Sequence, residues 1–382
     1  SAALPQILKK SGINYFLIQK LSWSQFNEFP HQTFHWRGID GTEILTHFPP
    51  ENTYNSELDT QFLLPAQTGF KEKDKLDEFI SLFGVGDGGG GPKPENIELG
   101  MRMGNLENSP RVSFDTAKNF FYRLENKKHC LDTWVGELYL ELHRGTLTTH
   151  GLVKKQNRKL EWKLRAVEML WSCIEMDKYP AVELDKLWKK LLINQFHDII
   201  PGSSINLVYQ TTYKEYEEIH HGCDNLIDQS SKILFEEDKN SFVLMNTLSY
   251  TWSGMINVPD SFHGYSIIDE EGKAVPTHKV GEKIEAFVSL KPLSFSTFKK
   301  GKENKLDHSV QSTPVLENDL IKYEFNDQGH MISAFDKELG REVLKSPGNI
   351  LSLYEDRPNN WDAWDIDFFY RGALQETAKV SS

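Results

Sequence analysis

The hydrophobic pattern changes twice along this chain, and those changes constrain the fold more than any single motif. From residue 1 to about residue 105, short strand-like runs such as INYFLIQ and EILTHFP alternate with helix-like runs such as KDKLDEFISLFG. The chain opens on SAALPQILKKSGINYF, which predicts a helix followed by a buried strand. Alternation of this kind is typical of an α/β domain, so we expect residues 1–105 to form part of one.

Apolar residues recur at helical spacing through the middle of the chain. They are Leu160, Leu164, Val167, Trp171 and Ile174; Leu184, Leu187, Trp188, Leu191 and Leu192; and Val208, Tyr216, Ile219, Cys223 and Ile227. Pro180 and Pro201-Gly202 separate the three runs. Long amphipathic helices with short connections predict a helical bundle over residues 106–237.

The pattern becomes β-like from residue 238 to residue 382. Strand-like runs are separated by turn signals, as in SFVLMNT, GMINVP, YSIID-EEGK-AVPT, KIEAFVSL and LIKYEF-NDQG-HMISAF. In IKYEF, apolar residues alternate with polar ones, which predicts a strand with one buried face. The expected fold is therefore multidomain, with a partial α/β barrel-like domain, a helical bundle and the start of a β-sandwich.

Composition narrows the class of partner and the compartment. The net charge is −12, with no long Lys/Arg block, and no apolar run approaches the length of a bilayer span. Nucleic acid and membrane are therefore not expected partners. Three widely spaced cysteines and the absence of any Asn-x-Ser/Thr sequon predict a cytoplasmic protein without a disulfide framework.

The segment FGVGDGGGGPKPE, residues 83–95, places four glycines directly after Asp87. A phosphate-binding loop would need Lys-Ser/Thr or a helix after the glycines, and Pro92 follows instead. Two other interpretations stay open. The run is either a flexible surface loop or a glycine-lined floor against which a substrate ring packs, with Asp87 directed at that ring.

The segment NQFHDIIPGSS, residues 194–204, predicts a turn between two helices. The preceding helix should end before Pro201-Gly202, and Ser203 or Ser204 should cap the next one. His197 and Asp198 would then lie near a helix C-terminus. Histidine is a frequent metal ligand, although an isolated His-Asp pair is more often a satisfied structural pair at a helix end.

Two further segments combine aromatic and polar residues. Residues 19–41 hold Lys20, Trp23 and Trp36, which could stack on a sugar or simply fill the core. WVGELYLELHRGTLTTHG, residues 134–151, holds Glu141 and Arg144 in an alternation that predicts a strand or irregular hairpin, with a solvated face as the plainer alternative. NNWDAWDID, residues 359–367, has the same ambiguity.

Taken in order, these segments resemble the α-mannosidases of glycoside hydrolase family 38, most closely the cytosolic and bacterial branch. QKLSW, FPHQTFHWRGIDG, FGVGDGGGGP, WVGELYLELHRGTLTT and LLINQFHDIIPGS carry the resemblance, which extends over nearly the whole chain. Gln32 and Arg37 depart from it, because a histidine and an acidic residue are expected at these positions.

The resemblance implies a retaining, metal-dependent exo-α-mannosidase that acts on a mannoside or a mannose-containing oligosaccharide. It implies Asp87 as acid/base and His197 as a ligand of a divalent metal, zinc or alternatively cobalt. We expect the remaining candidates, Asp198, Lys20, Trp23, Trp36, Glu141 and Arg144, to bind substrate. A homo-oligomer is compatible with the sequence.

The resemblance also implies that the chain is truncated at both ends. The family's nucleophilic Asp-x-Phe-Gly-like segment and its His-x-Asp ligands would precede SAALP. We therefore expect this fragment to be inactive alone and depleted of metal, although its parent is an enzyme. The alternatives are a non-catalytic carbohydrate-binding or assembly module on the same scaffold, or a phosphate-binding enzyme.

Overall fold

The computed structural model describes residues 1–87, 89–303 and 314–378. These residues form two compact units, Ser1–Arg144 and Gly145–Ser382, and each unit is described by itself. Among the described residues, no helix is both apolar enough and long enough to cross a membrane.

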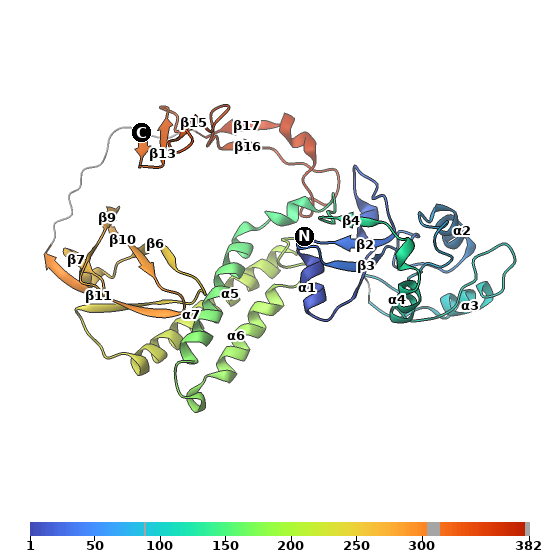
Figure 1. Ribbon diagram of the computed structural model, residues 1–382, viewed down its shortest axis with the longest axis horizontal. Coiled ribbons are helices and arrows are strands. Elements are labelled where there is room, and N and C mark those ends of the chain that lie inside the picture. The colour runs from blue at the N-terminus through green and yellow to red at the C-terminus, as the bar shows by residue number, and fades with distance from the viewer. Residues whose placement is uncertain (88, 304–313, 379–382) are drawn as a thin grey trace. The chain divides into compact units, whose positions relative to one another are not determined.

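The first unit contains a four-stranded sheet and several short helices (Figure 1). Its strands are β1 (Tyr15–Leu17), β2 (Thr33–Arg37), β3 (Glu43–His47) and β4 (Thr133–Val135). Its helices are α1 (Leu4–Lys10), α2 (Thr60–Gly69), α3 (Pro94–Met103) and α4 (Ala117–Glu125), with 3-10 turns η1 (Lys20–Trp23) and η2 (Lys128–Cys130). The predicted opening helix and strand are confirmed as α1 and β1.

The sheet of the first unit is open and mixed, in the order β1-β3-β2-β4. Strand β1 runs parallel to β3, β3 antiparallel to β2, and β2 parallel to β4. No closed barrel forms within the described residues. Helix α4 lies beyond the expected boundary at residue 105, yet its Phe120, Phe121 and Leu124 pack with Leu45 of β3 in one core.

Two expectations for this unit are wrong. The run KDKLDEFISLFG is not a helix: residues 73–75 form a turn and the rest is irregular, because buried Glu72 accepts hydrogen bonds from the backbone amides of Gln32 and Thr33 and thereby fixes the start of the segment. The predicted strand or hairpin over residues 134–151 is reduced to β4. Strand β4 ends before Gly136, because the φ of 114° at this glycine is incompatible with a β-strand.

The second unit begins with three long helices, which confirm the predicted periodic runs except at Ile174, which lies beyond the end of the first helix. They are α5 (Gly151–Trp171), α6 (Ala181–Asn194) and α7 (Asn206–Leu234), with 3-10 turns η3 (Arg144–Leu147) before α5 and η4 (Met176–Lys178) between α5 and α6. Their apolar faces share one core that includes Leu164, Leu191 and Cys223. Gly222 lets α7 approach α6 closely, because a Cβ there would lie 2.7 Å from Leu187.

Two neighbouring β-sheets follow the helices. One contains β5 (Ser241–Asn246), β11 (Ser294–Glu303), β7 (Tyr265–Ile268) and β8 (Ala274–Val275), in that order; the other contains β6 (Trp252–Asn257), β10 (Lys283–Leu290) and β9 (Thr277–Val280). Side chains of both sheets, such as Phe298 and Ala286, meet in one core with Phe262 of η5 (Asp260–Phe262). The predicted strands are confirmed, while the complete sandwich stays a prediction.

The last described segment holds two smaller sheets. They contain β12 (Val315–Glu317), β13 (Ile321–Phe325), β14 (Met331–Asp336) and β15 (Arg341–Glu342), and the pair β16 (Ser352–Tyr354) and β17 (Leu374–Thr377), with η6 (Phe368–Gly372) between the last two strands. The predicted one-sided burial of β13 is wrong, because all five of its residues are half-buried.

Candidate active site

Asp87 lies on the loop that the sequence singled out, next to a tight contact with another segment. Gly86 has no space for a side chain, because a Cβ there would lie 2.2 Å from the ring of Tyr54. This close approach lets the Tyr54 hydroxyl donate a hydrogen bond of 3.0 Å to Asp87 Oδ1. A Cβ on Gly89 or Gly91 would meet nothing within 4 Å, and Gly88 lies outside the described residues. Among the described glycines of residues 83–95, Gly86 is therefore the one at which a side chain would collide with another segment.

Lys20 and Trp23 complete a group around this carboxylate. Both belong to η1, and the Lys20 ammonium lies 3.5 Å from the centre of the Trp23 ring and 4.8 Å from that of Tyr54. Trp23 remains 38% exposed, so part of its surface is accessible. We call Lys20, Trp23, Tyr54 and Asp87 the Asp87 cluster. It combines a carboxylate, a cation and two aromatic rings, which is a combination suited to a polar ligand with a ring.

The electrostatics of the Asp87 cluster follow from the same contacts. Burial lowers the pKa of Lys20, and the nearby charge of Asp87 opposes this by raising it. The hydrogen bond to Asp87 is the main cause that raises the pKa of Tyr54. The raised pKa of Tyr54 favours the protonated hydroxyl that donates the hydrogen bond to Asp87.

Glu141 and Arg144 stabilise the loop that follows η1. Glu141 Oε2 accepts hydrogen bonds from the backbone amides of Phe26 and Asn27, at 3.1 and 2.7 Å. The hydrogen bond from the Asn27 side chain is the main cause that lowers the pKa of Glu141. The Arg144 guanidinium lies 5.4 Å from the centre of the Phe26 ring. Both candidates therefore contact the polypeptide beside the Asp87 cluster.

Trp36 is the candidate that the structure does not bring to this site. It is 1% exposed in a core with Phe34, and its indole donates a 2.7 Å hydrogen bond to Gly136 O. The two residues that depart from the family pattern also make internal contacts. Gln32 Oε1 accepts a bond from the Lys71 amide, and Arg37 Nε donates to Glu43 across the strands.

His197 and Asp198 lie on the turn between α6 and α7 in the second unit, as predicted. Helix α6 ends at Asn194, before Pro201-Gly202. The predicted serine cap is wrong, because Ile205 occupies the cap position and Ser204 Oγ instead donates a 2.6 Å hydrogen bond to Asp198 O. The serine therefore closes the turn rather than beginning α7.

The side chains of this turn offer donor atoms that zinc accepts. His197 is 76% exposed, and its Nε2 lies 3.5 Å from Asp198 Oδ2. An exposed imidazole beside a carboxylate fits part of a zinc site, which commonly needs three protein ligands in an enzyme. Among residues 1–87, 89–303 and 314–378, no group of three His, Cys, Asp or Glu side chains is arranged to hold a metal ion.

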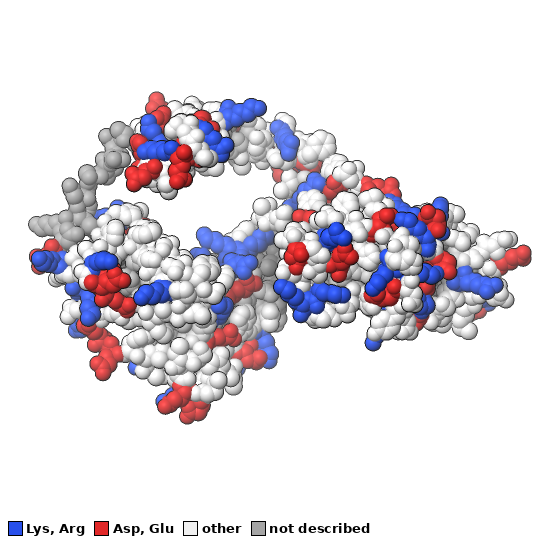
Figure 2. Space-filling model, viewed as in Figure 1, with Lys and Arg blue, Asp and Glu red and all other residues white. Residues whose placement is uncertain are grey.

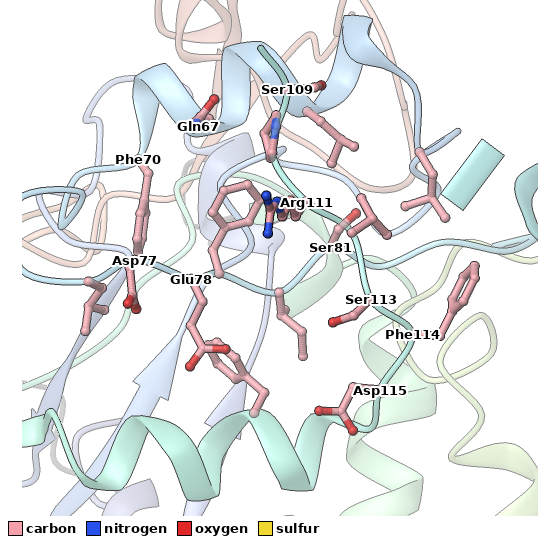
Figure 3. A pocket seen from close by; sticks show the side chains of 18 of the residues that line it. Gln67, Phe70, Asp77, Glu78, Ser81, Ser109, Arg111, Ser113, Phe114 and Asp115 are labelled. Carbon is pink, nitrogen blue, oxygen red and sulfur yellow. The ribbon is translucent and has the colours of Figure 1, made fainter. Parts of the chain in front are cut away.

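The first unit also contains a cavity of about 950 Å³. Figure 3 shows Arg111 projecting into it, with Asp77, Glu78 and Asp115 at its border. Arg123 pairs with both Glu78 and Asp115, so two of these acidic groups are already neutralised. No member of the Asp87 cluster lines this cavity.

Charges of both signs are mixed over the visible face of the first unit, which lies on the right of Figure 2. Ion pairs such as Arg37–Glu43 and Lys75–Asp132 bring opposite charges together in this unit. The visible face therefore carries no broad patch of a single charge.

Tyr54 is the functional candidate that sequence reasoning missed. It follows strand β3 in the loop FPPENTYNS, and loops after strand C-terminal ends often carry functional residues in α/β folds. That position is the only signal in the sequence. Its pairing with Asp87 requires a contact across 33 residues.

Comparison with known proteins links most of the chain to one family. Residues 1–137 match the family model described as glycosyl hydrolases family 38 N-terminal domain, residues 141–234 match the alpha mannosidase middle domain, and residues 316–381 match the glycosyl hydrolases family 38 C-terminal domain.

Similar curated proteins are much longer than this chain. Alpha-mannosidase G of Dictyostelium discoideum is 35% identical over 97% of this chain and 38% of its own length. Human alpha-mannosidase 2C1 is 34% identical over 96% of this chain and 35% of its own length. The Saccharomyces cerevisiae alpha-mannosidase is 33% identical over 97% of this chain and 33% of its own length. The chain thus spans little more than a third of these relatives.

The fold is also shared with a solved structure. The crystal structure of an alpha-mannosidase from Enterococcus faecalis V583 superposes with a TM-score of 0.62 at 17% identity, over 94% of this chain and 51% of the other. Three domain matches in family order, together with relatives of 33–35% identity over nearly the whole chain, have one explanation. This chain belongs to glycoside hydrolase family 38.

Proposed function

We propose that the protein that carries this chain is a retaining, metal-dependent exo-α-mannosidase. The observation that carries the proposal is the Asp87 cluster, in which a carboxyl group accepts a hydrogen bond from a hydroxyl and interacts with a cation that lies on a partly exposed indole. Family membership supplies the reaction class, and the named relatives are themselves α-mannosidases. The proposed substrate is a mannoside or a mannose-containing oligosaccharide.

Asp87 is the proposed acid/base. A retaining glycosidase needs one carboxyl group that first protonates the leaving oxygen and then takes a proton from the attacking water. Tyr54 OH would hold Asp87 Oδ1, which leaves Oδ2 free for the glycosidic oxygen. The Lys20 ammonium would favour the carboxylate after its proton has been transferred.

Trp23 is the proposed stacking surface beside this acid. Its ring is partly exposed, and Lys20 covers one face of it. An indole excludes water from one side of a saccharide ring and leaves its hydroxyls accessible to polar groups. Glu141 and Arg144 would act on the sugar indirectly, by fixing residues 26 and 27 next to η1.

His197 is the proposed metal ligand. Asp198 would either pair with the His197 imidazole or bind a sugar hydroxyl. A divalent metal, zinc or alternatively cobalt, would hold sugar hydroxyls and polarise them when bound. The His197 imidazole is exposed and its neighbouring carboxylate is close, so both are accessible to an ion. We propose a cytoplasmic location because Cys130, Cys173 and Cys223 form no disulfide bond.

The test is hydrolysis of an aryl α-mannoside by the whole protein, followed by proton NMR of the first sugar released. The α-anomer as first product, with activity lost on chelation and restored by zinc or cobalt, is the expected result. Mannoside binding without any hydrolysis would instead support a carbohydrate-binding module. Release of the β-anomer would contradict the retaining mechanism.

A further inference from the structure

Three segments that lie far apart in the sequence meet at Thr149 in the second unit. On one side, Gly202 of the His197 turn packs so closely that a Cβ there would lie 2.8 Å from Thr149 O. Lys154 Nζ donates hydrogen bonds to both Thr149 O and Ile200 O, and so ties the turn to the start of α5. On the other side, Thr149 Oγ1 donates a 3.1 Å hydrogen bond to Ala363 O, 214 residues away. The loop WDAWD is therefore attached to the turn that carries His197.

Backbone contacts hold this loop in one shape. The carbonyl of Trp361 accepts hydrogen bonds from the amides of Trp364 and Asp365, at 2.8 and 2.9 Å. Asp365 is 4% exposed, and its backbone packs against Gly145, where a Cβ would lie 3.0 Å from Asp365 O. Asn359 N donates to Asp367 Oδ2 at 2.8 Å, which closes the loop at its base.

The same loop presents a large aromatic side chain to solvent. Trp361 is 68% exposed and has a φ of 60°, a left-handed conformation that is unfavourable for a bulky residue. Strain of this kind persists where surrounding contacts impose it, and it is frequent at functional sites. Trp361 also borders a concavity of about 380 Å³ with Asn359, Asn360 and Asp362.

The chemistry of this concavity fits a pyranose ring. An indole face packs on the aliphatic C–H groups of a sugar. Amide side chains donate hydrogen bonds to the sugar hydroxyls and accept hydrogen bonds from them, whereas a carboxylate only accepts. Neither a phosphate nor an acidic peptide would be favoured, because the concavity has Asp362 and no cationic lining residue.

We infer that Trp361, together with Asn360 and Asp362, binds a saccharide ring of the substrate in the site to which the His197 turn belongs. The inference rests on the proposed function, since it takes the ring to be part of a mannoside. The loop's attachment through Thr149 explains why a rigid, strained shape is kept on a surface segment.

The test combines two measurements on Trp361→Ala and Trp361→Phe. Saturation-transfer NMR on the 382-residue chain with methyl α-D-mannopyranoside reports binding, and steady-state kinetics on the whole protein report KM and kcat. Removal of the indole should weaken binding by about five-fold and raise KM by a similar factor, with kcat little changed. Trp361→Phe should retain most of the affinity.

Trp162→Ala is the matched control. Trp162 is 45% exposed on α5 and its ring lies near Arg165, so the variant removes an exposed indole elsewhere in the same unit. It should leave both measurements unchanged. Equal binding and equal KM for Trp361→Ala and the unaltered protein would overturn the inference. A loss of binding in both Trp361 variants that follows a lowered melting temperature would also overturn it, because it would indicate a structural role only.

The two proposals fail in different ways. Unchanged KM in an active Trp361→Ala enzyme refutes the saccharide surface and leaves the mannosidase function intact. Binding that depends on Trp361 in a whole protein that hydrolyses no mannoside refutes the proposed function and supports the saccharide surface.

Discussion

The hydroxyl of Tyr54 donates a 3.0 Å hydrogen bond to Asp87, although 33 residues separate them in the sequence. Gly86 makes this contact possible, because any side chain at that position would collide with the Tyr54 ring. The residue before Asp87 therefore determines how this carboxyl group is held.

Replacement of Asp87 by Asn in the whole protein should nearly abolish hydrolysis of natural mannosides and spare activated aryl mannosides. A general acid contributes about 10²–10⁴-fold, and a good leaving group needs little protonation. The measurement is kcat/KM on both substrate types. Asp327→Asn, an exposed residue in the turn between β13 and β14, is the control and should have no effect. Equal losses on both substrate types would argue against an acid role for Asp87.

Tyr54→Phe should cause a smaller loss with the same dependence on leaving group. A hydrogen bond to a charged group is worth about 1.5–3 kcal/mol, so kcat on natural mannosides should fall by roughly ten-fold or more. Since Tyr54 acts through Asp87, the loss should shrink as the leaving group improves. Tyr250→Phe, which alters a 61% exposed tyrosine in the second unit, serves as the comparison. A loss independent of the leaving group would indicate only a structural role for Tyr54.

The whole protein should carry about one zinc per chain and lose it on His197→Ala, whereas the 382-residue chain purified without added metal should carry less than about one zinc per several chains. One exposed imidazole binds a divalent ion weakly, and affinity rises steeply as ligands are added. Elemental analysis of all three samples decides this, with His221→Ala on α7 as the control. Stoichiometric zinc in the 382-residue chain would mean that the metal site is misplaced.

Acidification should weaken the first unit through His47. Burial lowers the pKa of this imidazole from 6.5 to about 3, and Ile80 N donates to its Nε2, which identifies Nδ1 as the protonated nitrogen that faces Thr33 Oγ1. The unfolded state therefore binds more protons between about pH 3 and pH 6.5. Stability is full above this window and is lost as the pH falls through it.

The free energy of unfolding of the first unit should fall by about 3 kcal/mol between pH 7 and pH 4. Hydrogen exchange of peptides from β2 and β3, corrected for the intrinsic effect of pH, measures the opening free energy. His47→Gln should be less stable at pH 7 and should lose less on acidification, while His129→Gln at an exposed position should behave like the unaltered chain. A pH slope that persists in His47→Gln would assign the effect to another group.

The periodic segments could be predicted from the sequence because they depend on local geometry. The apolar spacing that ends at Trp171 and Leu192 follows the pitch of an α-helix, and the strands on either side of NDQG follow the period of a β-strand. The order of the motifs also identified the family, since each motif is a local string. Even Asp87 and His197 could be singled out in this way.

Segments whose partners lie far away could not be predicted. KDKLDEFISLFG has the composition of a helix but forms a turn followed by irregular backbone, because Glu72 is bound by amides about 40 residues earlier. Trp23 and Trp36 look equivalent in the sequence, yet Trp36 is buried and Trp23 remains partly exposed beside Lys20. Burial is a property of the packed domain and is not visible in a residue's immediate neighbours.

The sequence by itself therefore determined the helices, most of the strands and the family of this protein, and it singled out Asp87 and His197 as candidates. Only the tertiary structure decided that Tyr54 holds Asp87, that Glu141 fixes a loop, and that Thr149 joins the His197 turn to the loop of Trp361. The physical reason is the range of the forces involved. Backbone hydrogen bonding and side-chain period act within a few residues, whereas these three contacts form only after packing has closed loops of 33, 114 and 214 residues.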